Sequence, residues 1–249
     1  MSIETENDLA ALRKIGKIVA QCLQYMGSKL EPGMTTHELD ELGRAFLEKH
    51  GAKSAPELVY QFPGATCISV NEEAAHGIPG PKKLAAGDLV NIDVSAELDG
   101  YFADTGGSFV MPPESELKVN LCEATKRALQ AALKAARAGQ KLNVIGAAIE
   151  KEARKNNLTV IHNLGSHGVG RWLHEEPEFI PGYFDKRDKR HLKEGQVITI
   201  EPFLSTGATE VFDTGDGWTL GTKKGIFTAQ YEHTMVITRG QPIILTLPA

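Results

Sequence analysis

Five residues of the kinds that bind metal ions are spread along this chain, each within a stretch rich in strand formers and glycine. Carboxylates are unfavourable in strands, so four of them in such segments cost stability unless something compensates. A pair of divalent cations would compensate. Oxygen-rich ligation with one imidazole suits manganese, iron, cobalt or zinc at a paired site better than a structural zinc. The pattern indicates a metal-dependent hydrolase, and its candidate ligands are Asp93, Asp104, His167, Glu201 and Glu232.

The alternative for each acid is an ordinary solvated strand residue, which is the commoner case for any one of them alone. Asp93 fits that alternative least, because it stands between Ile92 and Val94. Four acids that meet the same criteria, together with a histidine in a glycine-rich turn, favour metal binding.

A turn dipeptide predicts how the first two carboxylates approach each other. Asp99-Gly100 is a favoured two-residue hairpin turn, and closing it there places Asp93 opposite Gly106. Asp93 and Asp104 then become diagonal neighbours on one sheet face, roughly 7–8 Å apart at the backbone. A slip of one residue would put them on opposite faces.

A second dipeptide, Asp216-Gly217, gives a parallel case in the later part of the chain. A hairpin centred there places Glu201 directly opposite Glu232. Like charges so placed repel unless cations sit between them. The intervening segment is long, and extra structure within it would change this pairing.

The elements that must position these residues occur in a repeated order of two helices followed by strands. Apolar residues at helical spacing predict the helices, and Thr35 with Glu38 forms a capping box that opens the second of them. Helices are expected over residues 5–29, 35–51, 115–138 and 143–156, with strands and turns over 66–111 and from 159 onward.

This order predicts an α+β fold of two similar halves, residues 1–111 and 112–249, with the site between them. Helices would cover one face of an antiparallel sheet. No linker rich in proline, serine or glycine separates the halves, so residues 1–249 are expected to form a single domain.

Composition excludes several classes of protein. The net charge is −5 without a basic stripe, so no nucleic-acid partner is indicated. Three cysteines stand far apart without a C-x-x-C pair, which argues against a disulfide framework. The N-terminal segment is polar and no apolar run reaches membrane-spanning length, so we expect no membrane partner and a cytoplasmic location. No feature demands an oligomer, and a monomer is expected.

Across almost its whole length the chain resembles the short bacterial class of type I methionine aminopeptidases, which have the pita-bread fold. The resemblance implies a metallo-exopeptidase that removes the initiator methionine from nascent polypeptides and from peptides with a small second residue. It also implies two divalent ions (cobalt, manganese, iron or zinc) that share a hydroxide, and an association with the ribosome. The motifs that carry it are NEEAAHGIPG, NIDVSAELDGYFADTG, HGVGRWLHEEP, TIEPF and AQYEHT.

The resemblance also implies roles for the five candidate ligands. Asp104 and Glu232 would bridge both ions. Asp93 would complete one coordination sphere, and His167 with Glu201 the other. Glu201 would also accept a proton from the attacking water.

Two histidines fall on substrate-contacting positions of that family. His76 would hydrogen-bond the scissile amide near its leaving nitrogen, and His174 would stabilise the oxyanion-like intermediate. A lone histidine such as His76 would otherwise more often be an ordinary surface residue. An apolar pocket for methionine would be lined by Phe62, Cys67 and Trp218, with Tyr60 and Leu173 as further candidates; ordinary core packing is the alternative for each.

Two departures from the family pattern concern the surroundings of the site. Ser166 stands where a glycine is usual, and Leu173 stands where an aromatic residue is frequent.

Three other functions compete with the aminopeptidase. Proline-specific peptidases of this fold have longer chains, binding proteins on this scaffold lose ligands, and a mononuclear iron oxygenase needs two histidines and one carboxylate.

Overall fold

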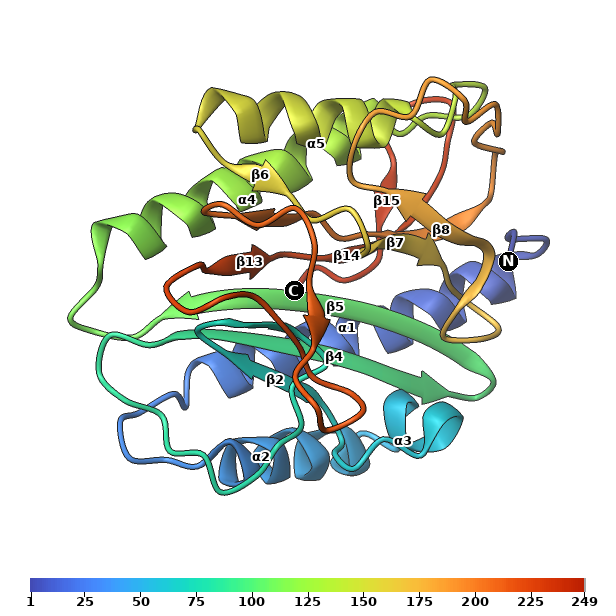
Figure 1. The fold of residues 1–249 in the computed structure, drawn as a ribbon. Helices are drawn as coiled ribbons and strands as arrows, with labels where there is room; N and C mark the ends of the chain where they lie inside the picture. Colours follow the sequence, from blue (N-terminus) through green and yellow to red (C-terminus); the bar gives the residue numbers. More distant parts are fainter. Residues whose placement is uncertain (249) are drawn as a thin grey trace.

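The computed structural model describes residues 1–248, in which each half pairs helices with an antiparallel hairpin (Figure 1). Four long helices occur where they are expected, within a few residues at each end. A fifth, α3, was not expected, because six residues with a proline in the first turn give little periodicity. The helices are α1 (Glu6–Gly27), α2 (Thr36–Lys49), α3 (Ala55–Tyr60), α4 (Glu116–Ala135) and α5 (Val144–Lys155). No helix among the described residues is long and apolar enough to cross a membrane.

The first two helices begin at capping boxes. The Thr35 hydroxyl accepts the backbone N–H of Glu38, and the Glu38 carboxylate accepts the backbone N–H of Thr35. Thr5 and Asp8 form the same arrangement before α1. Both boxes satisfy backbone N–H groups that the first helical turn leaves without partners, and the predicted start of α2 is confirmed.

The first-half hairpin has the predicted turn and the predicted register. β4 (Leu89–Leu98) and β5 (Tyr101–Val110) are joined by Asp99 and Gly100, whose φ angles of 54° and 81° suit a two-residue turn. Asp93 pairs with Gly106, and Ser95 pairs with Asp104. Asp93 and Asp104 are therefore diagonal neighbours on one face.

The second-half hairpin also keeps the predicted register, but its ladder is interrupted. Ile200 pairs with His233 before the interruption, and Phe203 pairs with Gln230 after it, which leaves Glu201 facing Glu232 in the gap. The same register continues to the Asp216-Gly217 turn. The paired strands are β9 (Val197–Ile200) with β14 (His233–Val236), β10 (Phe203–Ser205) with β13 (Thr228–Gln230), and β11 (Phe212–Asp213) with β12 (Leu220–Gly221).

The strands form several hydrogen-bonded groups rather than the one sheet that was expected. The pairings among the described strands are antiparallel, as predicted. Strand breaks separate the groups, and one of them falls where Glu201 and Glu232 face each other. The remaining strands are β1 (Lys53–Ser54), β2 (Cys67–Val70), β3 (Glu73–Ala75), β6 (Thr159–Val160), β7 (Gly165–Gly168), β8 (Glu175–Pro181) and β15 (Ile243–Ile244).

Hydrogen bonds between β5 and residues 232–234 join the two halves. The Thr105 hydroxyl donates to the Glu232 carbonyl at 2.8 Å, and the Glu232 N–H donates to the Gly106 carbonyl at 2.9 Å. The Thr234 hydroxyl accepts the Asp104 N–H at 2.9 Å. These bonds hold Asp104 and Glu232 side by side.

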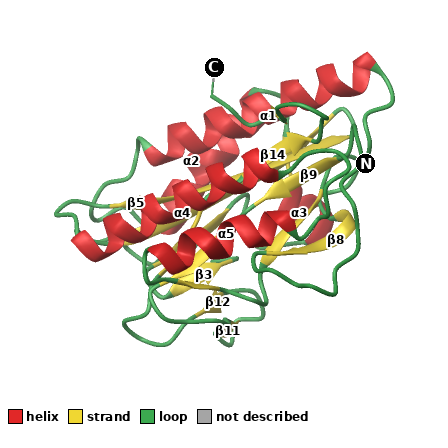
Figure 2. Cartoon of the chain, turned by 90° about the horizontal axis from the view of Figure 1, so that it is seen from above, coloured by secondary structure: helices red, strands yellow, loops and turns green. Residues whose placement is uncertain are grey.

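The helices cover one face of the strands, as expected. In Figure 1, α1 passes behind β4 and β5, and Figure 2 shows α4 and α5 lying next to each other over the second half. Ile92 and Val94 of β4 pack into the core with α1, while the alternating residues Asp93 and Ser95 line a cavity on the other face. The period of two along β4 thus separates the core from the site.

Candidate active site

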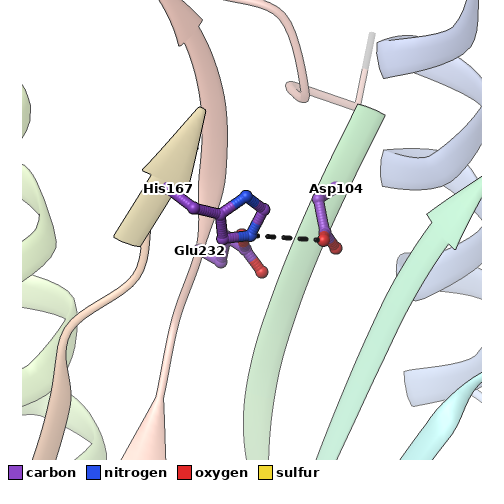
Figure 3. Close-up of side chains that lie close together, drawn as sticks. All are labelled: Asp104, His167 and Glu232. Atoms are coloured by element: carbon purple, nitrogen blue, oxygen red, sulfur yellow. Dashed lines mark ion pairs between the residues drawn. The ribbon is translucent and has the colours of Figure 1, made fainter. Parts of the chain in front are cut away.

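Three of the five predicted ligands form a tight cluster. Asp104 of β5, His167 of β7 and Glu232 just before β14 each place one ligand-type atom within 4.8 Å of the other two (Figure 3). All three side chains are buried. Residues from both halves therefore meet at one point, as the sequence predicts.

The other two predicted ligands lie at the edge of that cluster. Glu201 Oε1 is 3.6 Å from His167 Nε2, and Asp104 Oδ2 is 3.9 Å from the same nitrogen. Asp93 is the diagonal neighbour of Asp104 on the same face of the β4–β5 hairpin. All five side chains line one cavity.

The carboxyl groups of this cluster hold their protons more tightly than free carboxyl groups do when no cation is bound. Burial, followed by the charges of the neighbouring carboxylates, raises the pKa of Asp104, Glu201 and Glu232 well above the ordinary range. Burial also raises the pKa of Asp93 to about 6. Four acids that repel one another in a buried site are destabilising unless positive charge lies between them.

Two buried oxygens support that inference. Asp104 Oδ1 and Glu232 Oε1 have no hydrogen-bond partner among the described residues. Buried polar atoms are nearly always satisfied, and an unsatisfied pair points to a missing cation or water. The donor set of four carboxylates and one imidazole fits divalent cations.

His167 is arranged as a neutral ligand. Its Nδ1 lies 2.9 Å from the Gly168 carbonyl, which only accepts, so Nδ1 carries the proton and Nε2 offers a lone pair toward the acids. Burial, with a contribution from His174, lowers the pKa of His167 to about 3. A hydrogen bond at the second nitrogen is how proteins fix the orientation of a metal-binding imidazole.

Three residues that were not predicted as site residues hold the ligands in place. The Gln230 amide donates to Glu232 Oε2 at 3.1 Å and accepts from the Asn91 amide at 2.9 Å. The Ser166 hydroxyl accepts the backbone N–H of Glu201 at 2.9 Å. Gln230 could have been found from the sequence, because it precedes Glu232 by two residues and so falls on the same strand face.

The two predicted substrate-contacting histidines line the cavity, whose volume is about 350 Å³. His76 has a φ of 54°, a left-handed conformation that turns the chain sharply after β3. The His174 ring lies against the His167 ring with 4.0 Å between centroids. Burial lowers the pKa of both His76 and His174, the latter to about 4, so each is neutral near pH 7.

The apolar part of the cavity contains the predicted pocket residues. The Phe62 and Trp218 rings meet edge to face, with centroids 5.2 Å apart, and buried Cys67 lines the same cavity. Burial raises the pKa of the Cys67 thiol well above its usual range, so the thiol stays protonated. Tyr60 and Leu173 also line the cavity. Residues that were not predicted there are Pro56, Ser95, Asn163, Leu164, Gly165, Glu178, Phe179 and Phe203.

Comparisons with known proteins identify the relatives of this chain. Residues 10–239 match the model of metallopeptidase family M24. "Methionine aminopeptidase 2" of Bacillus subtilis is 51% identical over 247 residues, which cover 99% of each chain. The crystal structure of methionine aminopeptidase from Rickettsia prowazekii has a TM-score of 0.94 and 36% sequence identity, and the match covers 99% of this chain and 100% of that one.

A more distant structure shares the fold alone. Prolidase from Pyrococcus furiosus has a TM-score of 0.78 at 23% identity, and the match covers 98% of this chain but 65% of that one. The greater length of that chain is the difference expected of proline-specific relatives. The pita-bread fold predicted from the sequence is confirmed, and the chain belongs to metallopeptidase family M24.

Proposed function

We propose that this chain is a methionine aminopeptidase that removes the N-terminal methionine from nascent polypeptides and from peptides whose second residue is small. One observation carries the proposal. A cluster of four carboxylates and one imidazole stands in the same cavity as an apolar pocket. The metal site would cleave the peptide bond, and the adjoining pocket would select the side chain of the substrate's N-terminal residue.

Two divalent ions would be held by the five residues in distinct roles. Asp104 and Glu232 would bridge the ions, since both belong to the tight cluster with His167 and each has one buried oxygen without a partner among the described residues. Asp93 would complete one coordination sphere, and His167 with Glu201 the other, in keeping with the short distance between their side chains. When bound, the ions supply an activated water and polarise the scissile carbonyl.

The protein's own groups handle protons and charge. Glu201 would accept the proton of the attacking water, the role that the family resemblance implies, since its carboxyl lies in the ligand cluster 3.6 Å from His167 Nε2. Neutral His174 would donate a hydrogen bond to the carbonyl oxygen as negative charge develops there. His76, on the cavity wall, would hydrogen-bond the amide near its leaving nitrogen.

The apolar pocket would determine the choice of residue. Phe62 and Trp218 would make aromatic contacts with the unbranched thioether side chain of methionine, and Cys67 would make a sulfur contact with it. Discrimination among apolar side chains by such a pocket amounts to about 1–3 kcal/mol per methylene. The preference for a small second residue would follow from crowding at the cavity walls.

Further aspects of the proposal concern the ions and the partners. The donor set suits cobalt, manganese, iron or zinc, and availability in the cell would select among them. We propose that the enzyme acts as a monomer, since one chain supplies every predicted ligand and pocket residue. Its substrates would be new polypeptides in the cytoplasm, met at the ribosome.

The test is peptide hydrolysis before and after removal of metal. Met-Ala-Ser and an Xaa-Pro dipeptide are incubated with chelator-treated protein, and then with the same protein after cobalt, manganese, iron or zinc is added back. We expect free methionine only after metal is restored, and no cleavage of the Xaa-Pro bond. Cleavage by fully demetallated protein, or equal cleavage of Xaa-Pro, would overturn the proposal.

A further inference from the structure

Tyr60 makes a hydrogen bond that pocket lining alone does not explain. Its hydroxyl lies 2.7 Å from Nδ1 of His174, and the two ring centroids are 5.6 Å apart. The Tyr60 side chain is 42% exposed, and it lines the cavity together with His174. The contact therefore lies on the cavity wall.

Local backbone geometry holds Tyr60 in this place. Helix α3 ends at Tyr60, and Gln61 follows in the left-handed conformation with φ 57° and ψ 34°. The Gln61 and Phe62 N–H groups both bond back to carbonyls of α3. The reversal lets Tyr60 and Phe62 line the same cavity from either side of an exposed Gln61.

The hydrogen bond bears on which nitrogen of His174 carries a proton. A neutral imidazole has one N–H and one lone pair, and a phenol hydroxyl can donate to the lone pair. A hydroxyl that donates to Nδ1 leaves the proton on Nε2. The His174 ring also lies against the His167 ring, tilted by 32°, so this contact restrains its plane while the hydrogen bond selects the tautomer.

We propose that Tyr60 is a positioning residue: its hydroxyl donates a hydrogen bond to Nδ1 of His174 and keeps Nε2–H available to the carbonyl oxygen of the scissile peptide bond. The proposal rests on the function proposed above, in which His174 stabilises that oxygen. Tyr60 itself would not contact the reacting atoms.

The first experiment compares Tyr60→Phe with the unaltered enzyme, both loaded with metal. We expect kcat for Met-Ala-Ser to fall about tenfold, the usual size for losing the partner of a functional histidine. KM and the metal content should stay unchanged, because the ring still lines the cavity. Tyr25→Phe is the matched control, since Tyr25 of α1 stacks on Phe46 of α2 and does not line the cavity.

The second experiment separates positioning from packing. In a His174→Asn background, Tyr60→Phe should cause no further loss, because the two residues act as a unit. Nitrogen-15 NMR of the zinc-loaded enzyme with labelled histidine should show the Nε2–H tautomer at His174, and a mixture of tautomers in Tyr60→Phe. His174→Asn assigns the signal.

Three results would overturn the proposal. The first is an unchanged kcat in Tyr60→Phe. The second is a fall in kcat on adding Tyr60→Phe to His174→Asn that equals the fall in the unaltered background. The third is an Nδ1–H tautomer of His174 in the unaltered enzyme. If the unaltered, metal-loaded enzyme released no methionine, the proposed function would fail. The tautomer measurement would still decide the role of Tyr60.

Discussion

The two hairpins that carry the four carboxylates bring them to the site in different ways. In the first half, β4 and β5 run for ten residues each without interruption, and Asp93 and Asp104 are diagonal neighbours opposite small residues. In the second half, the ladder stops where Glu201 faces Glu232. One hairpin keeps its backbone pairing at the acids, and the other loses it.

The difference between the two hairpins follows from the repulsion between their carboxylates and from which groups accept the backbone hydrogen bonds. Carboxylates directly opposite each other repel more than diagonal ones. In the interrupted hairpin, the Glu201 N–H donates to the Ser166 hydroxyl, and the Glu232 N–H donates to the Gly106 carbonyl. The second pair of acids therefore depends on neighbours outside its own hairpin, whereas the first pair lies within a regular ladder.

The largest effect is expected where the two hairpins meet. Asp104→Asn should lower kcat/KM for Met-Ala-Ser about 10³-fold, because a bridging carboxylate no longer neutralises the ions. It should also lose one metal equivalent, measured by atomic absorption, with folding retained by circular dichroism. Glu232→Gln, from the other hairpin, is the matched variant and should lose as much. Full activity in Asp104→Asn would remove the proposed bridge.

A second effect concerns metal-free protein and pH. The folded-state pKa values of Asp104, Glu201 and Glu232 lie well above their unfolded values, so their contribution to stability is present at low pH and lost as pH rises. A tenfold difference in proton affinity between the folded and unfolded states corresponds to about 1.4 kcal/mol. Metal-free Asp104→Asn should therefore be more stable than the unaltered protein at pH 8.

The measurement is urea unfolding of both proteins between pH 6.5 and 8. His167 and His174 have folded pKa values of about 3 and about 4 against unfolded values near 6.5, so both make stability rise with pH near pH 6.5. Both proteins contain these histidines, so their contribution largely cancels in the comparison. The advantage of Asp104→Asn should widen as pH rises and vanish when metal is added. An advantage that stays constant with pH would contradict the raised pKa values.

The third prediction tests the dependence of the second hairpin on the first. A Cβ added at Gly106 would lie 2.3 Å from Gln230 Oε1, and Gln230 holds Glu232. Gly106→Ala should cost about 2 kcal/mol of unfolding free energy through overpacking. It should also weaken metal binding, measured by calorimetry. Gly107→Ala is the control, because its nearest neighbours lie at 3.7 Å. Equal effects at both positions would argue against the Gln230 contact.

The smallest effect concerns the Ser166 hydroxyl beside the interrupted hairpin. Ser166→Ala leaves the Glu201 N–H without its partner and should cost about 1 kcal/mol of unfolding free energy. Ser95→Ala, in the first hairpin, removes a hydroxyl with no hydrogen-bond partner among the described residues and should cost less. Equal losses in thermal or urea unfolding would show that the interrupted hairpin does not depend on Ser166.

Sequence patterns predicted both registers because turn dipeptides and a period of two are local properties. Asp99-Gly100 adopts the two positive φ angles that its turn type requires, and the register then fixes the pairing of Asp93 with Gly106. The register predicted from the Asp216-Gly217 turn, which places Glu201 opposite Glu232, is also confirmed, although the ladder between the turn and these residues is interrupted.

The features that the sequence did not predict depend on contacts between distant segments or on a local reversal of the chain. The break at Glu201 needs the Ser166 hydroxyl from another strand, and the place of Tyr60 needs a left-handed Gln61 after a helix of six residues. Neither leaves a periodic signal. The roles of the site residues and the single-domain assignment stay predictions.

The spacing of the ligands bears on how the protein is made. A partly synthesised chain that ends before residue 165 has Asp93 and Asp104 but neither His167 nor the two glutamates. Binding of the ions by all five ligands therefore requires the chain as far as residue 232, and cation uptake would report that segments from both hairpins have come together.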